Sequence, residues 1–144
     1  MDDGILQYKK AIEMKEDFVE AMSVLGVCYS ERGQLIEALD LFLKARTANS
    51  KYAEAYFNAG NTYVKLGKYP EALAEYREAV KLDKDNFDFV YECAILEEEC
   101  GDLDAALELW TRFMEFPEAS VYWEKAKEAE DRLASVKRKL KKRK

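Results

Sequence analysis

Histidine is absent from the 144-residue chain, and proline and cysteine are scarce, with two and three residues. Without histidine, every mechanism that needs a Ser-His pair, a Cys-His pair or a His-bound metal is excluded. No apolar run approaches the roughly 20 residues of a membrane-spanning helix. The first four residues are acidic where a signal peptide would be basic, so we expect no secretory signal in this chain.

The three cysteines form no Cys-x-x-Cys pair that would suggest a metal site. If Cys93 and Cys100 share a helix, their seven-residue spacing separates them by about 10 Å along its axis. A disulfide cannot span that distance without distortion. We therefore expect small apolar core residues in a reducing compartment, and so a cytoplasmic protein without a cofactor.

Basic residues are concentrated at one end of the chain. Residues 137–144 contain seven of the 23 lysines and arginines and no acid, so the rest of the chain has 16 basic and 29 acidic residues. We expect this tail to be solvated and to complement a helix dipole. Contact with nucleic acid or an anionic membrane is the less favoured interpretation, because no aromatic residues are interleaved with the charges.

The remaining sequence repeats itself with a period of 34 residues. Glycine recurs at Gly33, Gly67 and Gly101, and alanine, leucine and aromatic residues recur in the same register. The aromatic set is Phe42, Tyr76 and Trp110. This pattern predicts units of two amphipathic helices each, which must stack because neither helix can bury its apolar face alone.

The middle unit shows how such a helix pair is specified. Gly67 supplies a left-handed position that ends the first helix, and Pro70 suits the first turn of the second. Gly60 opposite Ala72 predicts a close approach of the two helix backbones, with Ala79 one turn further on.

Segment 53–86 resembles the tetratricopeptide repeat (TPR) family at its signature positions, which are Tyr56, Ala59, Gly60, Tyr63, Ala72, Tyr76 and Ala79. Segment 19–52 also matches, whereas the segment that begins at residue 87 is looser. There Glu97 replaces an aromatic residue and Phe113 replaces a close-contact alanine, so we expect the second helix to pack differently. The resemblance implies an all-α, TPR-type helical solenoid, but it indicates function only weakly.

We expect the second helix of a truncated repeat in 1–18, repeats in 19–52, 53–86 and 87–117, and a C-terminal amphipathic helix with a basic tail in 118–144. The helix near 3–16 lacks a partner helix. Either the chain is a fragment of a longer repeat array, or this open edge binds another molecule. The long helix from about residue 118 is expected to cap the third repeat, with a short coiled-coil contact as the alternative.

The resemblance implies a concave groove lined by the first helices of the repeats. By register, the predicted peptide-binding residues are Val27, Glu54, Phe57, Asn58, Asn61, Lys65, Asp88, Tyr91, Glu92 and Ile95. The same register adds further residues to the groove: Glu20, Ser23, Val24, Glu31, Val64, Glu98 and Glu99. Asparagine amides can hydrogen-bond a peptide backbone, and the excess of acids favours a basic or amphipathic peptide. Ordinary surface residues with no particular ligand are the alternative.

These features favour three functions to different degrees. The leading hypothesis is a non-enzymatic protein-protein interaction module, an adaptor that binds a partner segment in the acidic groove. The alternative is a self-associating scaffold, assembled through the open N-terminal edge or the C-terminal helix. Catalysis is not expected, because neighbouring carboxylates in 97–99 point about 100° apart on a helix. The family's carboxylate clamp is not expected either, because Asp88 and Glu92 would repel an acidic ligand.

Overall fold

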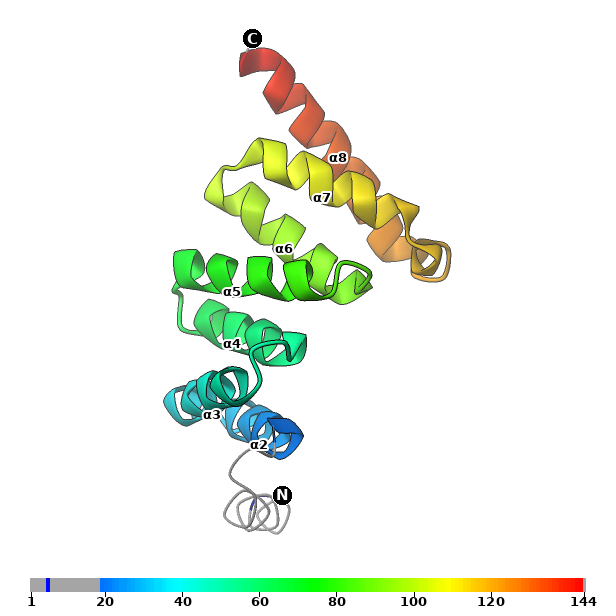
Figure 1. The fold of residues 1–144 in the computed structure, drawn as a ribbon. Helices are drawn as coiled ribbons and strands as arrows, with labels where there is room; N and C mark the ends of the chain where they lie inside the picture. Colours follow the sequence, from blue (N-terminus) through cyan, green and yellow to red (C-terminus); the bar gives the residue numbers. More distant parts are fainter. Residues whose placement is uncertain (1–4, 6–18, 144) are drawn as a thin grey trace. The chain divides into compact units, whose positions relative to one another are not determined.

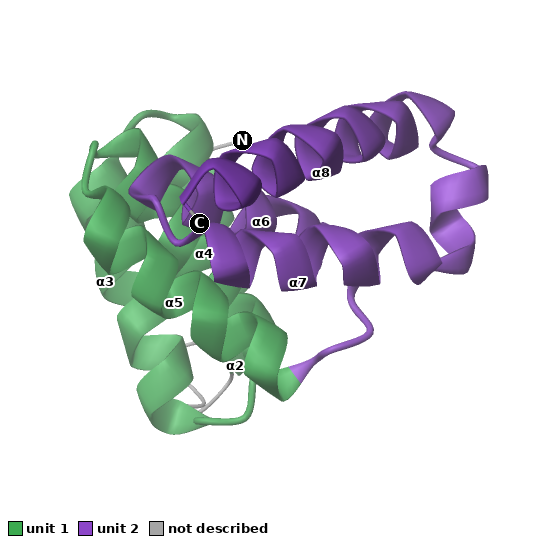
Figure 2. Ribbon diagram, turned by 90° about the horizontal axis from the view of Figure 1, so that it is seen from above, with its two compact units in different colours: residues 1–82 green, residues 83–144 purple. Residues whose placement is uncertain are grey.

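The computed structural model describes residue 5 and residues 19–143, and every regular element in this part of the chain is helical. Figure 1 shows the elements in order. They are α2 (Val19–Glu31), α3 (Leu35–Ala48), α4 (Ala53–Lys65), α5 (Tyr69–Leu82), α6 (Phe87–Cys100), α7 (Leu103–Glu115), the short 3-10 helix η1 (Pro117–Ser120) and α8 (Trp123–Arg143). The chain divides into two compact units, residues 1–82 and residues 83–144 (Figure 2).

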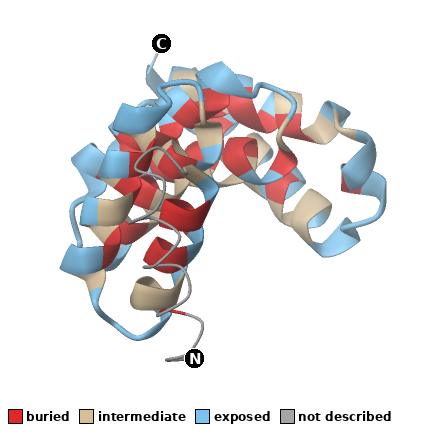
Figure 3. Cartoon of the chain, turned by 60° about the horizontal axis from the view of Figure 1, so that its bottom comes forward, coloured by how far each residue is buried: buried red, intermediate tan, exposed pale blue. Residues whose placement is uncertain are grey.

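The predicted 34-residue period appears directly in the helix boundaries. The first helices of the repeats begin at Val19, Ala53 and Phe87, and the second helices begin at residues 35, 69 and 103. Each first helix packs against the second helix that follows it, and the buried residues lie on these facing sides (Figure 3). The prediction of an all-α fold of the TPR solenoid class is confirmed.

The turn within each pair is made by glycine. Gly33, Gly67 and Gly101 adopt φ values of 80°, 77° and 92°, in the left-handed region that a side chain would strain. Pro70 lies in the first turn of α5, as its missing N–H group predicts.

The predicted close approach of α4 and α5 is present at Gly60. A Cβ atom at this position would lie 2.5 Å from Tyr76 Cδ1 and 3.3 Å from the Ala72 carbonyl oxygen. The neighbour that fills the space is therefore mainly the Tyr76 ring, which is itself buried. The same arrangement occurs between α2 and α3, where a Cβ on Gly26 would lie 2.6 Å from Phe42 Cε1.

An ion pair links the second helices of unit 1. The Arg46 guanidinium of α3 donates a hydrogen bond to Glu75 of α5, and it also lies over the Tyr56 ring at 5.5 Å. Burial raises the pKa of Glu75 above its ordinary value, and the positive charge of Arg46 opposes that shift only in part.

The helix pair of unit 2 packs a cluster of aromatic rings beside its buried alanines, Ala94 and Ala106. Phe113, fully buried on α7, stacks on Phe87 of α6 with ring centroids 4.3 Å apart. Its ring also meets Trp110 edge to face at 5.8 Å, and Phe87 in turn stacks on Tyr122. The expectation that this pair packs differently is confirmed, because Phe113 occupies the position of Ala79 in the preceding repeat.

The C-terminal α-helix begins later than the sequence pattern predicted. Pro117–Ser120 form η1, so α8 starts at Trp123 and not near residue 118. Ala129 and Val136 are its buried contacts with the rest of unit 2. The predicted helix near 3–16 lies outside the described residues, apart from Ile5, which is buried.

None of the three cysteines is in a disulfide, and they lie in three different environments. Cys93 is buried, Cys28 is half-buried and Cys100 is exposed, so the expected core role applies to Cys93 and not to Cys100. None of the described helices is long and apolar enough to cross a membrane.

Candidate peptide-binding surface

A pocket of about 180 Å³ lies in unit 1 where α2 and α4 run side by side. Its lining consists of residues from both first helices and one from α3: Val27, Ser30, Glu31, Phe42, Asn58, Asn61, Thr62 and Lys65. The structure thus brings together five residues that the register had assigned to the groove. Phe42, Ser30 and Thr62 were not predicted, and Phe42 had been assigned only to the core.

The two asparagines of the pocket differ in what they offer a ligand. The Tyr76 hydroxyl donates a hydrogen bond to Asn61 Oδ1 over 2.5 Å, which fixes that side chain and leaves its amide N–H groups. The Asn58 side chain has no hydrogen-bond partner among the described residues and can both donate and accept. Asn58 also anchors the local structure, because its carbonyl oxygen accepts a bond from the buried Thr62 hydroxyl over 2.9 Å.

Charged and apolar groups surround these amides. Lys65 Nζ donates to Ser30 Oγ over 2.8 Å and thereby joins α4 to α2. Val24 and Val27 leave 39% and 38% of their surfaces exposed on α2. Phe57 is half-buried, and its ring lies 5.4 Å from that of Tyr76.

Two other groove positions of unit 1 are already engaged or hidden. Glu54 accepts a hydrogen bond from the Tyr52 hydroxyl over 2.9 Å. Burial, followed by this bond to Glu54, raises the pKa of Tyr52 to about 12. Ser23 is a correction to the prediction: it is 3% exposed and belongs to the core of α2, so it does not face the groove.

The predicted groove residues of unit 2 lie on α6, where side chains from α8 contact them. The Tyr91 hydroxyl donates to Glu128 Oε2 over 2.6 Å, and Lys125 Nζ lies 4.7 Å from the centre of the Tyr91 ring. Lys125 is also 3.9 Å from Asp88 Oδ1. Burial, reinforced by the hydrogen bond to Glu128, raises the pKa of Tyr91 to about 12. Ile95, on the same helix, is half-buried.

Glu92 is held among several charges. Burial raises its pKa above the ordinary value, the nearby Lys125 opposes the shift, and Asp88 and Glu128 add to it. Further along α6, Arg132 of α8 lies 3.2 Å from Glu98. Two cations from α8 therefore offset part of the acidic surface that the sequence predicted for α6.

The contacts of α8 follow the repeat register, which the sequence analysis did not recognise. Arg132 follows Glu98 by 34 residues and pairs with it, and Lys125 follows Tyr91 by the same interval and lies over its ring. Within unit 2, α8 therefore occupies the position of a further first helix after α7. The signal was available in the 34-residue spacing, but the irregular segment 117–122 interrupts the pattern.

Metal binding has no obvious location in this part of the molecule. Across residue 5 and residues 19–143, no group of three or more cysteine, aspartate and glutamate side chains could hold a metal ion.

Comparison with known proteins gives one family model, described as "TPR repeat", which matches residues 60–96. The Photosystem I assembly protein Ycf3 of Rippkaea orientalis is 37% identical over 78 residues, covering 51% of this chain and 45% of Ycf3. The solved structure of YrrB, "a TPR protein with an unusual peptide-binding site", superposes with a TM-score of 0.71 at 28% identity. That match covers 77% of this chain and 57% of YrrB.

PcrH, solved in complex with the chaperone-binding region of PopD, has a TM-score of 0.73 at 23% identity, covering 88% of this chain and 96% of PcrH. At this identity the likeness concerns the fold alone. The chain spans less than half the length of the curated relatives it matches.

Proposed function

We propose that this chain, which belongs to the tetratricopeptide repeat family, is a non-enzymatic protein-interaction module. Its ligand is a basic or amphipathic peptide segment of a partner protein, bound along α2 and α4 of unit 1. The likeness to YrrB, whose structure is described as having a peptide-binding site, supports this class of ligand.

The observation that carries the proposal is the pocket between α2 and α4. It places the Asn58 amide, which has no partner within residues 19–143, beside Asn61, whose orientation Tyr76 fixes. Two adjacent amides with free donors can satisfy the carbonyl groups of an extended peptide, which has no internal hydrogen bonds of its own. Exposed Val27 on the pocket wall offers a contact for an apolar side chain.

Charge favours a basic ligand in unit 1. Glu20, Glu31 and Glu54 are exposed along α2 and α4, whereas Lys65, already bonded to Ser30, is the one cation among the groove positions predicted there. Such an acidic surface raises the local concentration of cationic ligands, and this effect weakens as salt shortens the screening length. In unit 2 the preference is weaker, because Lys125 and Arg132 lie near the acids of α6.

The test is a fluorescence anisotropy titration with matched Lys-rich and Glu-rich peptides that share the same apolar residues, at low and at physiological salt. We expect tighter binding of the Lys-rich peptide and a larger salt effect on it. Asn58→Ala should weaken its binding about tenfold, the value of one good hydrogen bond of roughly 1.4 kcal/mol. Glu31→Lys should reduce the difference between the two peptides.

The control is Gln34→Ala, because Gln34 is an exposed amide outside the pocket whose side chain makes no capping bond. It should bind both peptides as the unmodified chain does. Equal binding of both peptides, or tighter binding of the Glu-rich one, would contradict the charge argument. A pull-down that captures the same partners with Phe57→Ala/Asn58→Ala as with the unmodified chain would contradict the location of the site.

Self-association is the second candidate, and exposed apolar residues near the start of α8 favour it. Val121, Tyr122 and Trp123 leave 70%, 54% and 66% of their surfaces exposed. Light scattering over a range of concentrations separates the two functions, since only a scaffold grows beyond a monomer or a discrete dimer. Growth that Tyr122→Ser/Trp123→Ser abolishes would support the scaffold, and a constant mass would oppose it.

A further inference from the structure

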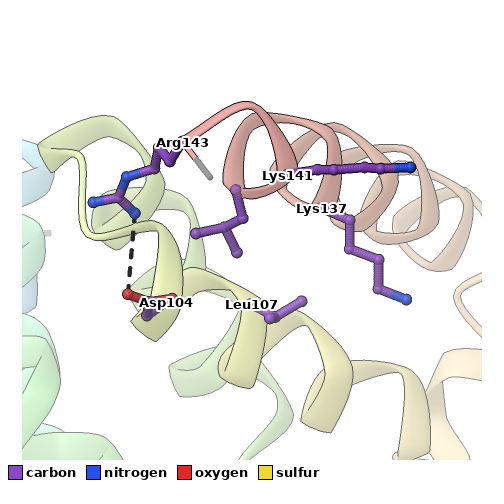
Figure 4. A pocket seen from close by; sticks show the side chains of 6 residues that line it. Asp104, Leu107, Lys137, Lys141 and Arg143 are labelled. Carbon is purple, nitrogen blue, oxygen red and sulfur yellow. Dashed lines mark ion pairs between the residues drawn. The ribbon is translucent and has the colours of Figure 1, made fainter.

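A second pocket lies in unit 2, between α7 and the C-terminal half of α8 (Figure 4). Its volume is about 520 Å³, and its lining combines two leucines with charged residues: Asp104, Leu107, Lys137, Leu140, Lys141 and Arg143. This volume falls within the range of about 300–1,000 Å³ that is typical of ligand sites in proteins. The pocket is separate from the groove of the proposed function, and it uses the basic tail that the groove does not explain.

The charge at the mouth of this pocket is only partly balanced. Arg143 Nη1 lies 4.0 Å from Asp104 Oδ2, and both side chains are mostly exposed, with 56% and 81% of their surfaces accessible. Lys137 and Lys141 have no ion pair with a described residue, although they lie one helical turn apart on α8. Like charges at that spacing repel each other, so an anion placed between them would be stabilising.

The apolar part of the pocket restricts the kind of anion. Leu107 of α7 faces α8 across the pocket (Figure 4), and Leu140 completes an apolar lining without an aromatic ring. Nucleic acid bases would find no ring on which to stack. A free phosphate would leave the leucines uncovered. The lining best fits a ligand that carries one large apolar group with carboxylates on either side of it.

We propose that this pocket binds an acidic peptide segment of a partner protein. One apolar side chain of the segment enters between Leu107 and Leu140, and flanking carboxylates pair with Lys137 and Lys141. With an acidic groove in unit 1 and this basic pocket in unit 2, the chain recognises two partner segments of opposite charge.

The experiment is an anisotropy titration with a fluorescein-labelled peptide in which one leucine is flanked on both sides by aspartate and glutamate. We expect Lys137→Glu/Lys141→Glu to weaken binding about tenfold or more, the equivalent of roughly 1.4 kcal/mol. The matched control is Arg138→Glu/Lys139→Glu, which changes the net charge equally at neighbouring positions that do not line the pocket. This control should retain most of the affinity. Circular dichroism and a thermal melt verify that both variants fold.

Two further comparisons test the nature of the ligand. Replacing the peptide's leucine by glycine should weaken binding to the unmodified chain, whereas Asn58→Ala should leave it unchanged because Asn58 belongs to the groove. The proposal is overturned if both charge-reversed variants lose affinity equally, which would indicate attraction to the tail as a whole. It is also overturned if the peptide does not bind while vesicles of phosphatidylcholine and phosphatidylserine do, which would indicate a membrane surface.

Discussion

Gly60 allows the sharpest test of the helix packing. In the repeat of segment 53–86, this residue lets α4 approach α5 so closely that a Cβ atom would lie 2.5 Å from Tyr76 Cδ1 and 2.6 Å from Cε1. The ring has little freedom to move aside. Tyr76 is 3% exposed, its hydroxyl is bonded to Asn61, and its face lies against Phe57.

Two opposing effects determine how much a substitution of Gly60 changes the free energy of unfolding. Gly60→Ala removes backbone entropy from the unfolded chain and gains about 1 kcal/mol of helix propensity. Overpacking of a filled core costs about 1–3 kcal/mol, so alanine should destabilise by a net of about 0–2 kcal/mol. Gly60→Leu gains similar propensity but places three further carbons against Tyr76 and Ala72. We expect it to cost about 3 kcal/mol or more, at the upper end of measured overpacking.

Urea denaturation followed by circular dichroism gives these free energies, with an unchanged m-value as the sign that the denatured state is unaffected. Tyr76→Phe provides the internal control, because removal of the hydroxyl releases the ring from Asn61. In a double-mutant cycle, Gly60→Ala should then cost less in the Tyr76→Phe background. If Gly60→Leu unfolds at the same urea concentration as the unmodified chain, the assigned register of α4 against α5 is wrong.

The remaining predictions concern charge and the C-terminus. Because burial raises the pKa of Glu92 above 4.5, its contribution to stability is present at low pH and is lost as pH rises through the raised value. Glu92→Gln should therefore stabilise the chain at pH 7 and lose that advantage below about pH 4, as urea denaturation at the two pH values would show. Arg46→Met leaves Glu75 buried without its cation and should destabilise by about 1–3 kcal/mol at pH 7, and less in acid, where Glu75 becomes protonated. Deletion of residues 137–144 should preserve the helical circular dichroism spectrum and cost about 1 kcal/mol, because Val136, the buried anchor of α8, remains. A collapse of the melting temperature would instead show that this segment is needed for the fold.

The repeat register made most of the fold predictable. Each repeat has a glycine with a positive φ angle in its turn, namely Gly33, Gly67 and Gly101. No other residue type adopts this left-handed conformation as easily. Their 34-residue spacing therefore fixed the turns, and the apolar periodicity fixed the helices between them. The same register placed Val27, Asn58, Asn61 and Lys65 on facing first helices, and these residues line one pocket.

Contacts that depend on a particular rotamer were beyond the sequence. The Tyr76 hydroxyl of α5 donates a hydrogen bond to Asn61 of α4. The sequence predicted Tyr76 as a core aromatic residue and Asn61 as a groove amide, and it gave no reason to connect the two. Ser23 was assigned to the groove because the register gives a direction but not the depth of burial. The ion pair of Arg46 with Glu75 was not predicted for the same reason.

The side chains of α8 continue the contacts between first helices within unit 2. Side chains from α8 contact α6 as those of one first helix contact another, through Lys125 on Tyr91 and Arg132 on Glu98. In the middle repeat, the face of α4 that receives its second helix carries Gly60 and Tyr63. Two repeat periods, or 68 residues, after Gly60 and Tyr63 come Glu128 and Asp131 of α8. Glu128 accepts a hydrogen bond from Tyr91 of α6, and Asp131 is exposed. A second helix packed on this part of α8 would have to bury the Asp131 carboxylate, at a large desolvation cost.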